Sequence, residues 1–275
     1  MSSRSDNNAN WEKISAIATV IGLIITVIGF RIVGRHFEID ACTPSNSSYV
    51  SSSSSSVSSD EDESTIIIGK DINESDLDGL DVTDNGNYFT FSFGEYMQGS
   101  SGEIQPIEWR VLAVNDRKVL VISEKLLDYV PYTRECKKIT WENCTLRQWM
   151  NNTFLCNAFS KEQQKKIATV TNDNSNYSSS GRNGGNSTQD KIFALSIREA
   201  NTYFPSNSDR IAYVTNYVYS RGNAHKDYSS WWWLRSPGSE NNYATDVRSN
   251  GHTDIDGYDV DCLSVAVRPA MWIYL

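Results

Sequence analysis

The sequence has few of the residues from which common catalytic and metal-binding motifs are built. Its 275 residues include three histidines and five cysteines, and no two cysteines follow the CxxC spacing of a structural zinc site. The Walker loop, the GxGxxG fingerprint and the GxSxG nucleophile elbow are also absent. These absences argue against a zinc site, a nucleotide-binding enzyme and an α/β-hydrolase.

The cysteines do not define a disulfide framework. An odd number leaves at least one thiol unpaired within the chain. Cys136 and Cys144 flank one loop and could pair; two free structural thiols are the alternative.

Positive charge is in deficit as well. The chain has 25 Lys and Arg against 34 Asp and Glu, which gives a net charge of −9. Four of the acids lie together at residues 60–63, in a stretch that we interpret as solvated linker. Nucleic-acid binding requires clustered Lys and Arg to meet the phosphates, so we expect no nucleic-acid partner.

A long apolar run lies near the start of the chain. Residues 14–33, ISAIATVIGLIITVIGFRIV, carry one charge, Arg31, and are apolar on every helical face. Twenty residues of α-helix rise about 30 Å, which matches the hydrocarbon core of a bilayer. We therefore predict a single-pass transmembrane anchor after a short tail of residues 1–13, with the lipid bilayer as a partner.

The orientation of this anchor is not decided by charge, because two basic residues flank each side of it. Residues 34–86 contain the run SSSSSSVSSDEDES and many further acids, with too few apolar residues to fold. We interpret them as a disordered linker that displays a globular head, residues 87–275, outside the cytoplasm. The alternative topology keeps the head in the cytoplasm.

The head mixes strand and helix patterns. YFTFSFGEY (88–96) alternates aromatic residues and predicts a strand. PIEWRVLAV (106–114) and KVLVISE (118–124) are joined by a short polar link and predict a β-hairpin. Helical spacing follows at 145–155, and the polar stretch Asn172–Thr188 predicts a functional or disordered loop. The combination predicts an α+β domain.

Two further helices are predicted from their first turns. Ser160 with Gln163, and Ser196 with Glu199, have the spacing of a capping box. Just before the second box, KIFAL (191–195) is a short apolar run and predicts a buried strand.

The run WWWLRSPG begins with three adjacent tryptophans. In a strand, Trp231 and Trp233 would share one face, and Trp232 and Leu234 the other. We expect all three rings to be core, with Arg235 held by backbone carbonyls or a carboxylate; an aromatic sugar platform at Trp231 or Trp233 is the alternative. The expected core residues are Trp109, Trp149, Trp231, Trp232, Trp233, Arg235 and Arg268.

A family resemblance is carried by motifs spread over the whole head. Between Tyr88 and Leu275 the chain contains, in order, FGEY, PIEWRVL, ISE, WENCTLRQWMN, AFSKEQ, DKIFALS, EANTYF, WWWLRSPG and VRPAMWI. In this combination it resembles the bacterial family called domain of unknown function 6273. That family is similar to the C-type-lectin-like fold, with formylglycine-generating enzymes and retroelement-diversified receptors as more distant relatives. The resemblance implies a C-type-lectin-like head in which the tryptophan strand and Val267–Ala270 flank a variable surface region.

The region between those two strands, residues 239–262, is rich in Tyr, Asn, Ser and Asp. Tyr supplies rigid contact area and Asn and Ser supply adaptable hydrogen bonds, as in antibody paratopes. Asn250 and Gly251 predict a tight hairpin turn. We expect a ligand-binding surface here; a polar loop without a special role is the alternative. The candidate ligand-binding residues are Asn242, Tyr243, Asp246, Arg248, Asn250, His252, Asp254 and Tyr258.

Metal and catalytic chemistry have weaker sequence support. The aspartates of DIDGYDVD (254–261) could bind Ca²⁺, but the EF-hand spacing is not met, so no metal site or cofactor is predicted. Formylglycine-generating enzymes use a cysteine pair near the late core strand, and WWWLRS has no cysteine there. That activity is therefore not transferred, and no catalytic residue is predicted.

The expected function is noncatalytic recognition of a glycan or protein ligand at the cell surface, through the loops at 172–188 and 239–262. A structural or assembly role in the cell envelope is one alternative. An enzyme of the formylglycine-generating-enzyme-like fold is another.

Overall fold

The computed structural model describes residues 66–115, 117–175, 181–222 and 224–275. The predicted tail, the predicted transmembrane anchor and most of the predicted linker lie outside the described residues. Within the described ranges, no helix is both long enough and apolar enough to cross a membrane. All of these ranges belong to one compact unit.

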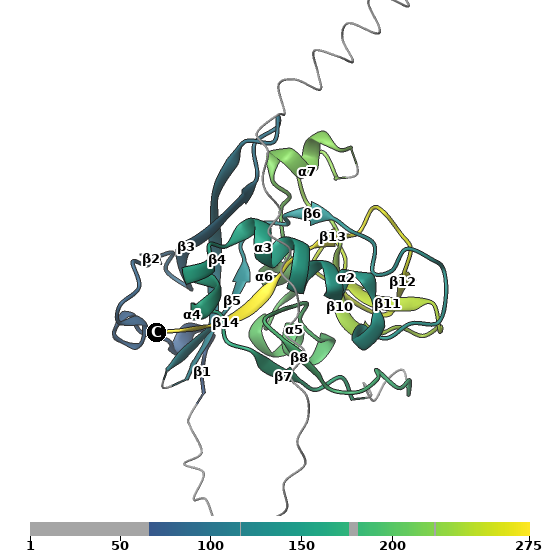
Figure 1. Ribbon diagram of the computed structural model, residues 1–275, viewed down its shortest axis with the longest axis horizontal. Helices are drawn as coiled ribbons and strands as arrows, with labels where there is room; N and C mark the ends of the chain where they lie inside the picture. Colours follow the sequence, from purple (N-terminus) through teal and green to yellow (C-terminus); the bar gives the residue numbers. More distant parts are fainter. Residues whose placement is uncertain (1–65, 116, 176–180, 223) are drawn as a thin grey trace, which may run out of the picture. The chain divides into compact units, whose positions relative to one another are not determined.

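The head is a mixed α+β domain composed mostly of sheet, which confirms the predicted class (Figure 1). Its strands are β1 (Ile67–Ile68), β2 (Thr83–Asp84), β3 (Phe89–Met97), β4 (Ile104–Asn115), β5 (Lys118–Ser123), β6 (Asp128–Tyr129), β7 (Val170–Asn172), β8 (Thr188–Asp190), β9 (Ile192–Phe193), β10 (Trp232–Pro237), β11 (Tyr243–Val247), β12 (Thr253–Asp259), β13 (Ala266–Val267) and β14 (Ala270–Tyr274). Its α-helices are α2 (Thr145–Trp149), α3 (Leu155–Ala158), α4 (Lys161–Lys166), α5 (Ile197–Tyr203), α6 (Asn207–Arg210) and α7 (Asn216–Ser220).

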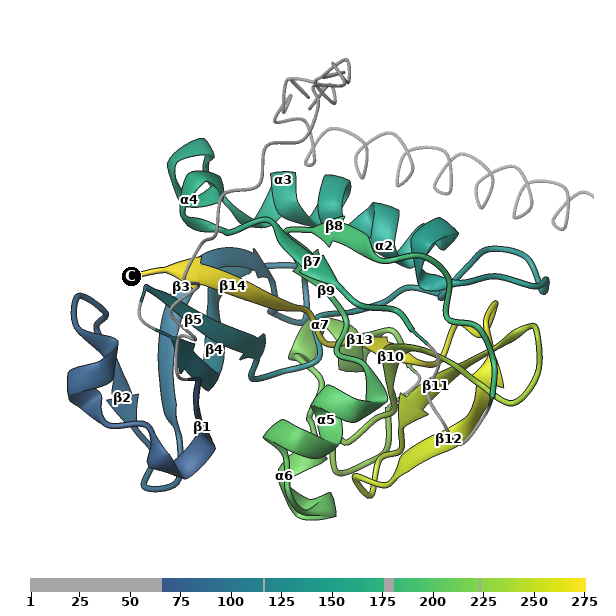
Figure 2. The same ribbon diagram turned by 90° about the horizontal axis from the view of Figure 1, so that it is seen from below.

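The strands of the described residues form three sheets. The largest has seven strands in the order β2-β3-β4-β5-β14-β9, with β1 also paired to β4. The second has five strands in the order β12-β11-β10-β13-β6, and β7 pairs with β8 alone. Figure 2 shows the two larger sheets next to each other, with α2, α3 and α4 along one side and α5 and α6 on the other. Helix α5 contacts β10 and β12 of the second sheet.

The β4–β5 hairpin is formed as predicted. Its strands pair antiparallel, from Trp109 opposite Ser123 to Asn115 opposite Lys118. The side chains at positions 119–122 are all buried, because both faces of β5 are covered. Trp109 is buried as well, and its indole N–H donates to the carbonyl of Phe93 at 2.7 Å.

The predicted linker boundary at residue 86 is wrong, because the ordered head begins earlier. Strand β1 pairs with β4, so that Ile67 lies opposite Val114. Ile72 and Leu77 are 6% and 1% exposed and belong to the core. A few well-placed apolar residues therefore hold this acidic segment on the sheet, although its composition resembles that of a disordered chain.

Both predicted capping boxes are present. Ser160 with Gln163 begins α4, and Ser196 with Glu199 begins α5. The helix predicted at 145–155 forms as α2 and α3, which are joined by a π-helical turn, Met150–Phe154.

The three adjacent tryptophans differ in burial. Trp232 and Trp233 are buried, whereas Trp231 lies just before β10 and is only half-buried. The expectation that all three rings are core is therefore wrong for Trp231, and Trp149 is also only half-buried. Both pack against the edge of the core. Trp109, Arg235 and Arg268 are buried.

Candidate functional site

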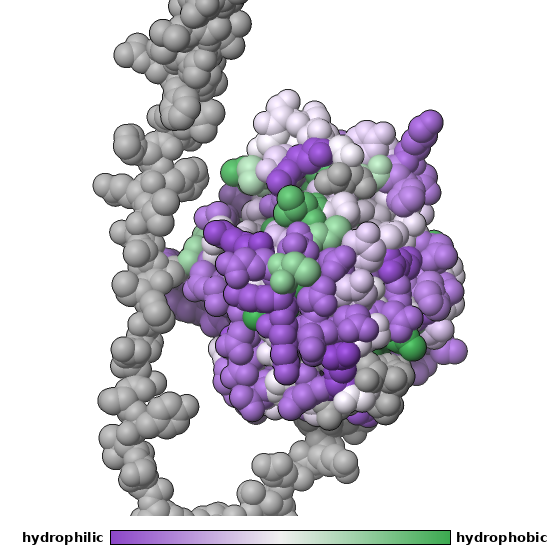
Figure 3. All heavy atoms as spheres, turned by 90° about the vertical axis from the view of Figure 1, so that its right-hand side faces the viewer, coloured by the Kyte–Doolittle hydropathy of each residue, from purple (hydrophilic) through white to green (hydrophobic). Residues whose placement is uncertain are grey.

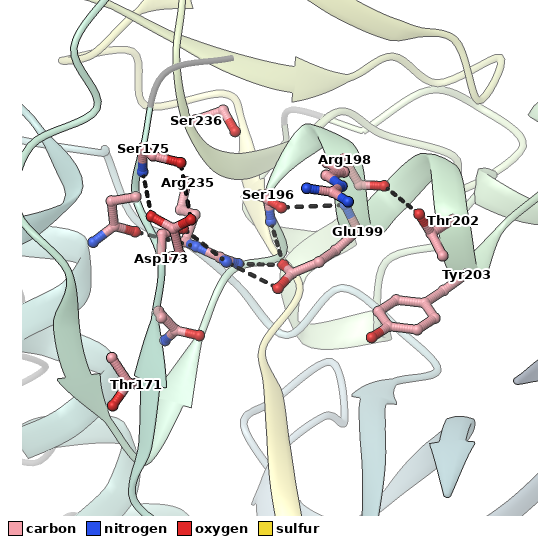
Figure 4. Close-up of a pocket in the computed structure, with 12 residues that line it drawn as sticks. Thr171, Asp173, Ser175, Ser196, Arg198, Glu199, Thr202, Tyr203, Arg235 and Ser236 are labelled. Carbon is pink, nitrogen blue, oxygen red and sulfur yellow. Dashed lines mark hydrogen bonds and ion pairs between the residues drawn. The ribbon is translucent and has the colours of Figure 1, made fainter. Parts of the chain in front are cut away.

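A polar cavity of ≈ 430 Å³ lies between the chain after β7, helix α5 and the end of β10. Small-molecule sites usually enclose roughly 300–1,000 Å³, so its size suits a small ligand or one end of a larger one. Figure 4 shows Asp173 and Ser175 on one side of this cavity, Arg198, Thr202 and Tyr203 of α5 on the other, and Glu199 and Arg235 between them. We call it the α5 pocket.

The α5 side of the pocket is fixed by the capping box. The Ser196 hydroxyl accepts a hydrogen bond from the Glu199 N–H at 3.1 Å, and the Ser196 N–H donates to Glu199 Oε2 at 2.7 Å. This exchange satisfies two backbone donors of the first helical turn. It also holds the Glu199 carboxylate at the pocket's centre.

Arg235 forms the floor of the pocket and is 4% exposed. Its guanidinium makes a two-point ion pair with Glu199, in which Nη2 donates to Oε1 at 2.9 Å. It also donates to the carbonyl of Ala194 at 3.1 Å and to Asn174 Oδ1 at 3.2 Å. A buried guanidinium whose N–H groups donate in this way is held rigidly, and its charge is compensated by the carboxylate.

Three groups around this floor remain open to a ligand. Asp173 accepts from the N–H and the hydroxyl of Ser175 at 2.8 and 2.9 Å, and these bonds hold the pKa of its carboxyl below the usual value. Burial, with the nearby Glu199 charge, raises the pKa of Tyr203 to about 12, so its hydroxyl stays protonated. Neither the Tyr203 hydroxyl nor the Arg198 guanidinium has a hydrogen-bond partner within the described ranges. The pocket therefore offers an acceptor, a hydroxyl and a cation.

The described lining of the pocket lacks the nucleophile and histidine pair of a serine or cysteine hydrolase. It contains no histidine and no cysteine, and the hydroxyl of Ser175 is bonded to a carboxylate rather than to an imidazole. General-base activation of a serine requires a base such as His beside it. The geometry supports hydrogen-bonding recognition.

The loop on the other side of the pocket is anchored by a buried carboxylate. Asp190 is 1% exposed and pairs with Arg147 at 2.6 Å. Its second oxygen accepts from Trp141, Asn172 and Thr188 at 3.0, 2.9 and 2.7 Å. Because Asn172 and Thr188 pair across β7 and β8, both ends of the predicted loop start from this one carboxylate. Residues 176–180 of that loop lie outside the described part of the chain.

Four of the predicted ligand-binding residues meet on one face of the second sheet. Arg248 pairs with Asp254 through Nε at 2.9 Å and with Asp246 at 3.2 Å, and it lies over the Trp231 ring. Tyr258 packs edge-on against the same ring, with 5.4 Å between the centroids. Asp246 is fully buried and therefore not accessible to a ligand. The prediction that it contacts a ligand is wrong. Figure 3 shows the side of the head that includes β11 and β12 as mostly polar.

The remaining predicted residues lie apart from this cluster. Asn250 and His252 are exposed at the β11–β12 turn, which forms at Gly251 with a φ of 79° as predicted. That turn is docked on α6, because Arg210 donates to the carbonyl of Gly251 at 2.9 Å. At the opposite end of β11, Asn242 donates to Asp259 at 3.0 Å.

The two predicted loops do meet, at a smaller cavity of ≈ 280 Å³ that Tyr243 lines. Arg182 of the first loop donates there to Asn241 Oδ1 of the second at 2.7 Å and also bonds the carbonyl of Ser239. The two segments are therefore in direct contact through Arg182.

The aspartates of the proposed calcium segment are divided between two places. Asp254 pairs with Arg248, whereas Asp259 and Asp261 lie near Cys136. Among the described residues, Cys136, Asp259 and Asp261 form a group of potential metal ligands, whose ligand atoms lie within 4.8 Å of one another. Exposed acidic groups of this kind are common without a metal.

The α5 pocket was reached by sequence analysis in part. The loop after Asn172 was expected to be functional and the capping box of α5 was recognised, but Arg198, Glu199 and Tyr203 were not proposed as site residues. A cluster of polar residues behind a capping box was the available signal. The pairing of Glu199 with Arg235 spans 36 positions and has no local pattern.

Comparison with known proteins adds a family but no activity. The family model described as Domain of unknown function (DUF6273) matches residues 116–275. No curated protein matches the chain. No solved structure matches it.

Proposed function

This chain belongs to the family described as Domain of unknown function (DUF6273), and we propose that its head is a noncatalytic domain that recognises a glycan in the α5 pocket. The observation that carries the proposal is the pocket's construction. The buried Arg235 is paired with Glu199, and around this pair lie the Tyr203 hydroxyl, the Arg198 guanidinium and the Asp173 carboxylate, which bonds Ser175 and can accept further hydrogen bonds. Sugars present many hydroxyls, each of which can donate and accept, and such groups match this lining.

The proposal includes a C-type-lectin-like fold and display at the cell surface. The motif WWWLRSPG forms β10 and the motif VRPAMWI continues into β14, with the β11–β12 hairpin between them in sequence. This order supports the family resemblance. The apolar run at 14–33 supports a single-pass anchor, with the head outside the cytoplasm.

The test is a glycan array probed with the full-length chain in a mild detergent. Two variants accompany it: Tyr203→Phe, which removes one hydroxyl from the pocket, and Tyr258→Phe, which removes one from the second sheet. We expect Tyr203→Phe to weaken binding about three- to tenfold, the value of one neutral hydrogen bond, and Tyr258→Phe to leave it unchanged.

The opposite pattern would move the site to the surface predicted from the sequence, around Trp231 and Arg248. Binding to no glycan, with capture of a cell-envelope protein, would favour the structural role. Release of a product from a bound sugar would show an enzyme.

A further inference from the structure

We propose that the ligand of the α5 pocket is a carboxylated sugar, whose carboxylate is bound by Arg198 and whose hydroxyls are bound by Asp173 and Tyr203. This inference rests on the proposed function of the same pocket and names its ligand class. Some charged groups of the pocket already have partners within the protein, and others do not. The inference follows from this difference.

The two central charges cancel. Arg235 and Glu199 face each other in a two-point ion pair, and Arg235 is almost completely buried. A ligand that displaced either group would leave a buried charge unpaired, at a cost of several kcal/mol. The pair is therefore a fixed floor, and the charge that a ligand meets comes from the groups around it.

Asp173 does not require a cationic ligand. Both of its oxygens already accept hydrogen bonds from Ser175, one from the N–H and one from the hydroxyl. Each carboxylate oxygen can accept more than one bond, so capacity for a ligand's hydroxyl remains. Arg198 and Arg235 also stabilise its charge from a distance.

Arg198 interacts with the Asp173 charge only from a distance and has no direct side-chain partner among the residues that the structure describes. It lies in the first turn of α5, is exposed, and forms no ion pair or side-chain hydrogen bond with a described residue. Other arginines of the head, such as Arg110, Arg147 and Arg248, are paired with carboxylates. A guanidinium presents parallel N–H donors that match the two oxygens of a carboxylate. A ligand with one carboxylate would thus complete the pocket.

Neutral polar groups make up most of the remaining lining. Tyr203 presents a hydroxyl with no partner in the described ranges, and Thr171, Asn172, Ser175 and Thr202 also line the cavity. A ligand with one carboxylate and several hydroxyls fits this distribution better than a free amino acid, which offers an ammonium group and few other donors.

The test compares matched sugars by calorimetry on the full-length chain in detergent. The probes are methyl glucuronide, methyl glucoside, which replaces the carboxylate by a hydroxymethyl group, and glutamate as an amino acid. We expect the glucuronide to bind about ten- to a hundredfold more tightly than the glucoside, the usual value of a charge-assisted hydrogen-bond pair.

The decisive variant is Arg198→Gln, with Arg134→Gln as the matched control, because Arg134 is an exposed arginine outside the pocket. Arg198→Gln is expected to abolish the preference for the glucuronide and to leave binding of the glucoside within about twofold. Arg134→Gln is expected to keep the wild-type preference. Near-ultraviolet circular dichroism checks that both variants remain folded.

The outcomes separate the two proposals. Equal binding of both sugars, or a preference that survives Arg198→Gln, overturns the carboxylated ligand and leaves glycan recognition standing. Binding of glutamate without either sugar overturns both. Binding of none of the three probes overturns the carboxylated sugar as the ligand, and the glycan array then decides on glycan recognition.

Discussion

The guanidinium of Arg248 lies over the indole ring of Trp231, with 3.8 Å between Cζ and the ring centroid. The same guanidinium pairs with Asp254 and with the buried Asp246. One face of Trp231 is therefore already occupied by a cation–π contact. A sugar could stack on that face only by displacing Arg248 from both carboxylates, which is why we place recognition in the α5 pocket instead.

Asp246 makes stability depend on pH. Burial raises the pKa of its carboxyl to about 7, despite the opposing effect of Arg248, and the Asp254 charge raises it further. In the unfolded chain the pKa is about 3.9. Between these values the unfolded chain loses a proton that the folded chain keeps. The free energy of unfolding should then fall as pH rises from about 4 to 7, by up to about 1.4 kcal/mol per pH unit.

The measurement is urea unfolding of the wild type and Asp246→Asn at pH 5, 6, 7 and 8. We expect the variant to gain stability relative to the wild type up to about pH 7, and the difference to level off above it. If the free energies of unfolding of the two proteins changed with pH in parallel over the whole range, the assigned role of this carboxyl would be contradicted.

At Tyr228 we expect a glycine variant to be more stable than an alanine variant, which is the reverse of the order found within helices. Tyr228 is the non-glycine residue with positive φ, 66°, among those described, and its ring stacks on Tyr219 with 4.0 Å between centroids. The left-handed conformation costs an L-residue about 1–2 kcal/mol but costs glycine little. We expect Tyr228→Gly to be more stable than Tyr228→Ala by about 1 kcal/mol in urea unfolding.

Tyr219, within α7, provides the control for this comparison. Within a helix, glycine lowers the free energy of unfolding by about 1 kcal/mol relative to alanine. We therefore expect the Tyr219→Ala variant to be more stable than the Tyr219→Gly variant. The same order at both positions would show that Tyr228 carries no backbone strain.

Asp190 should be among the most sensitive polar positions. Asp190→Asn leaves Arg147 without its counter-charge and turns an amide N–H₂ toward groups that are themselves donors. Breaking a buried pair in this way costs about 3 kcal/mol. Glu162→Gln breaks the exposed pair with Lys165 and should change stability by less than about 0.5 kcal/mol. Similar losses in the two variants, measured by urea unfolding, would refute the anchoring role of Asp190.

The thiols should differ sharply in reactivity. Cys136 is exposed and Cys144 is buried, and both are free. Burial raises the pKa of the Cys144 thiol to about 12, so almost no thiolate is present at pH 8. Iodoacetamide at that pH should label Cys136 and spare Cys144 until urea is added, as read by peptide mass spectrometry. A disulfide-linked peptide that contains both residues would contradict the structure.

The start of the head is testable by truncation. A fragment of residues 66–275 keeps β1 and the buried Leu77, whereas a fragment of residues 88–275 lacks both. Burial of one leucine side chain contributes about 1.5–3 kcal/mol. We expect the shorter fragment to unfold at a clearly lower urea concentration, and equal midpoints would restore the predicted linker boundary.

Much of the local structure was determined by the sequence. The β4–β5 hairpin, the Ser160 and Ser196 capping boxes and the turn at Gly251 depend on residues a few positions apart, and each formed as predicted. Alternation, capping and turn chemistry act within one element, so they can be recognised without knowing the fold.

The site was decided by the tertiary structure. Glu199 and Arg235, Asp190 and Trp141, and Arg248 and Trp231 meet only because strands and helices distant in sequence pack together. Composition also misjudged residues 66–86, because a few buried side chains outweigh many exposed acids once a sheet is there to receive them. Long-range contacts of this kind leave no periodic trace in the chain, and they determine which polar groups remain free for a ligand.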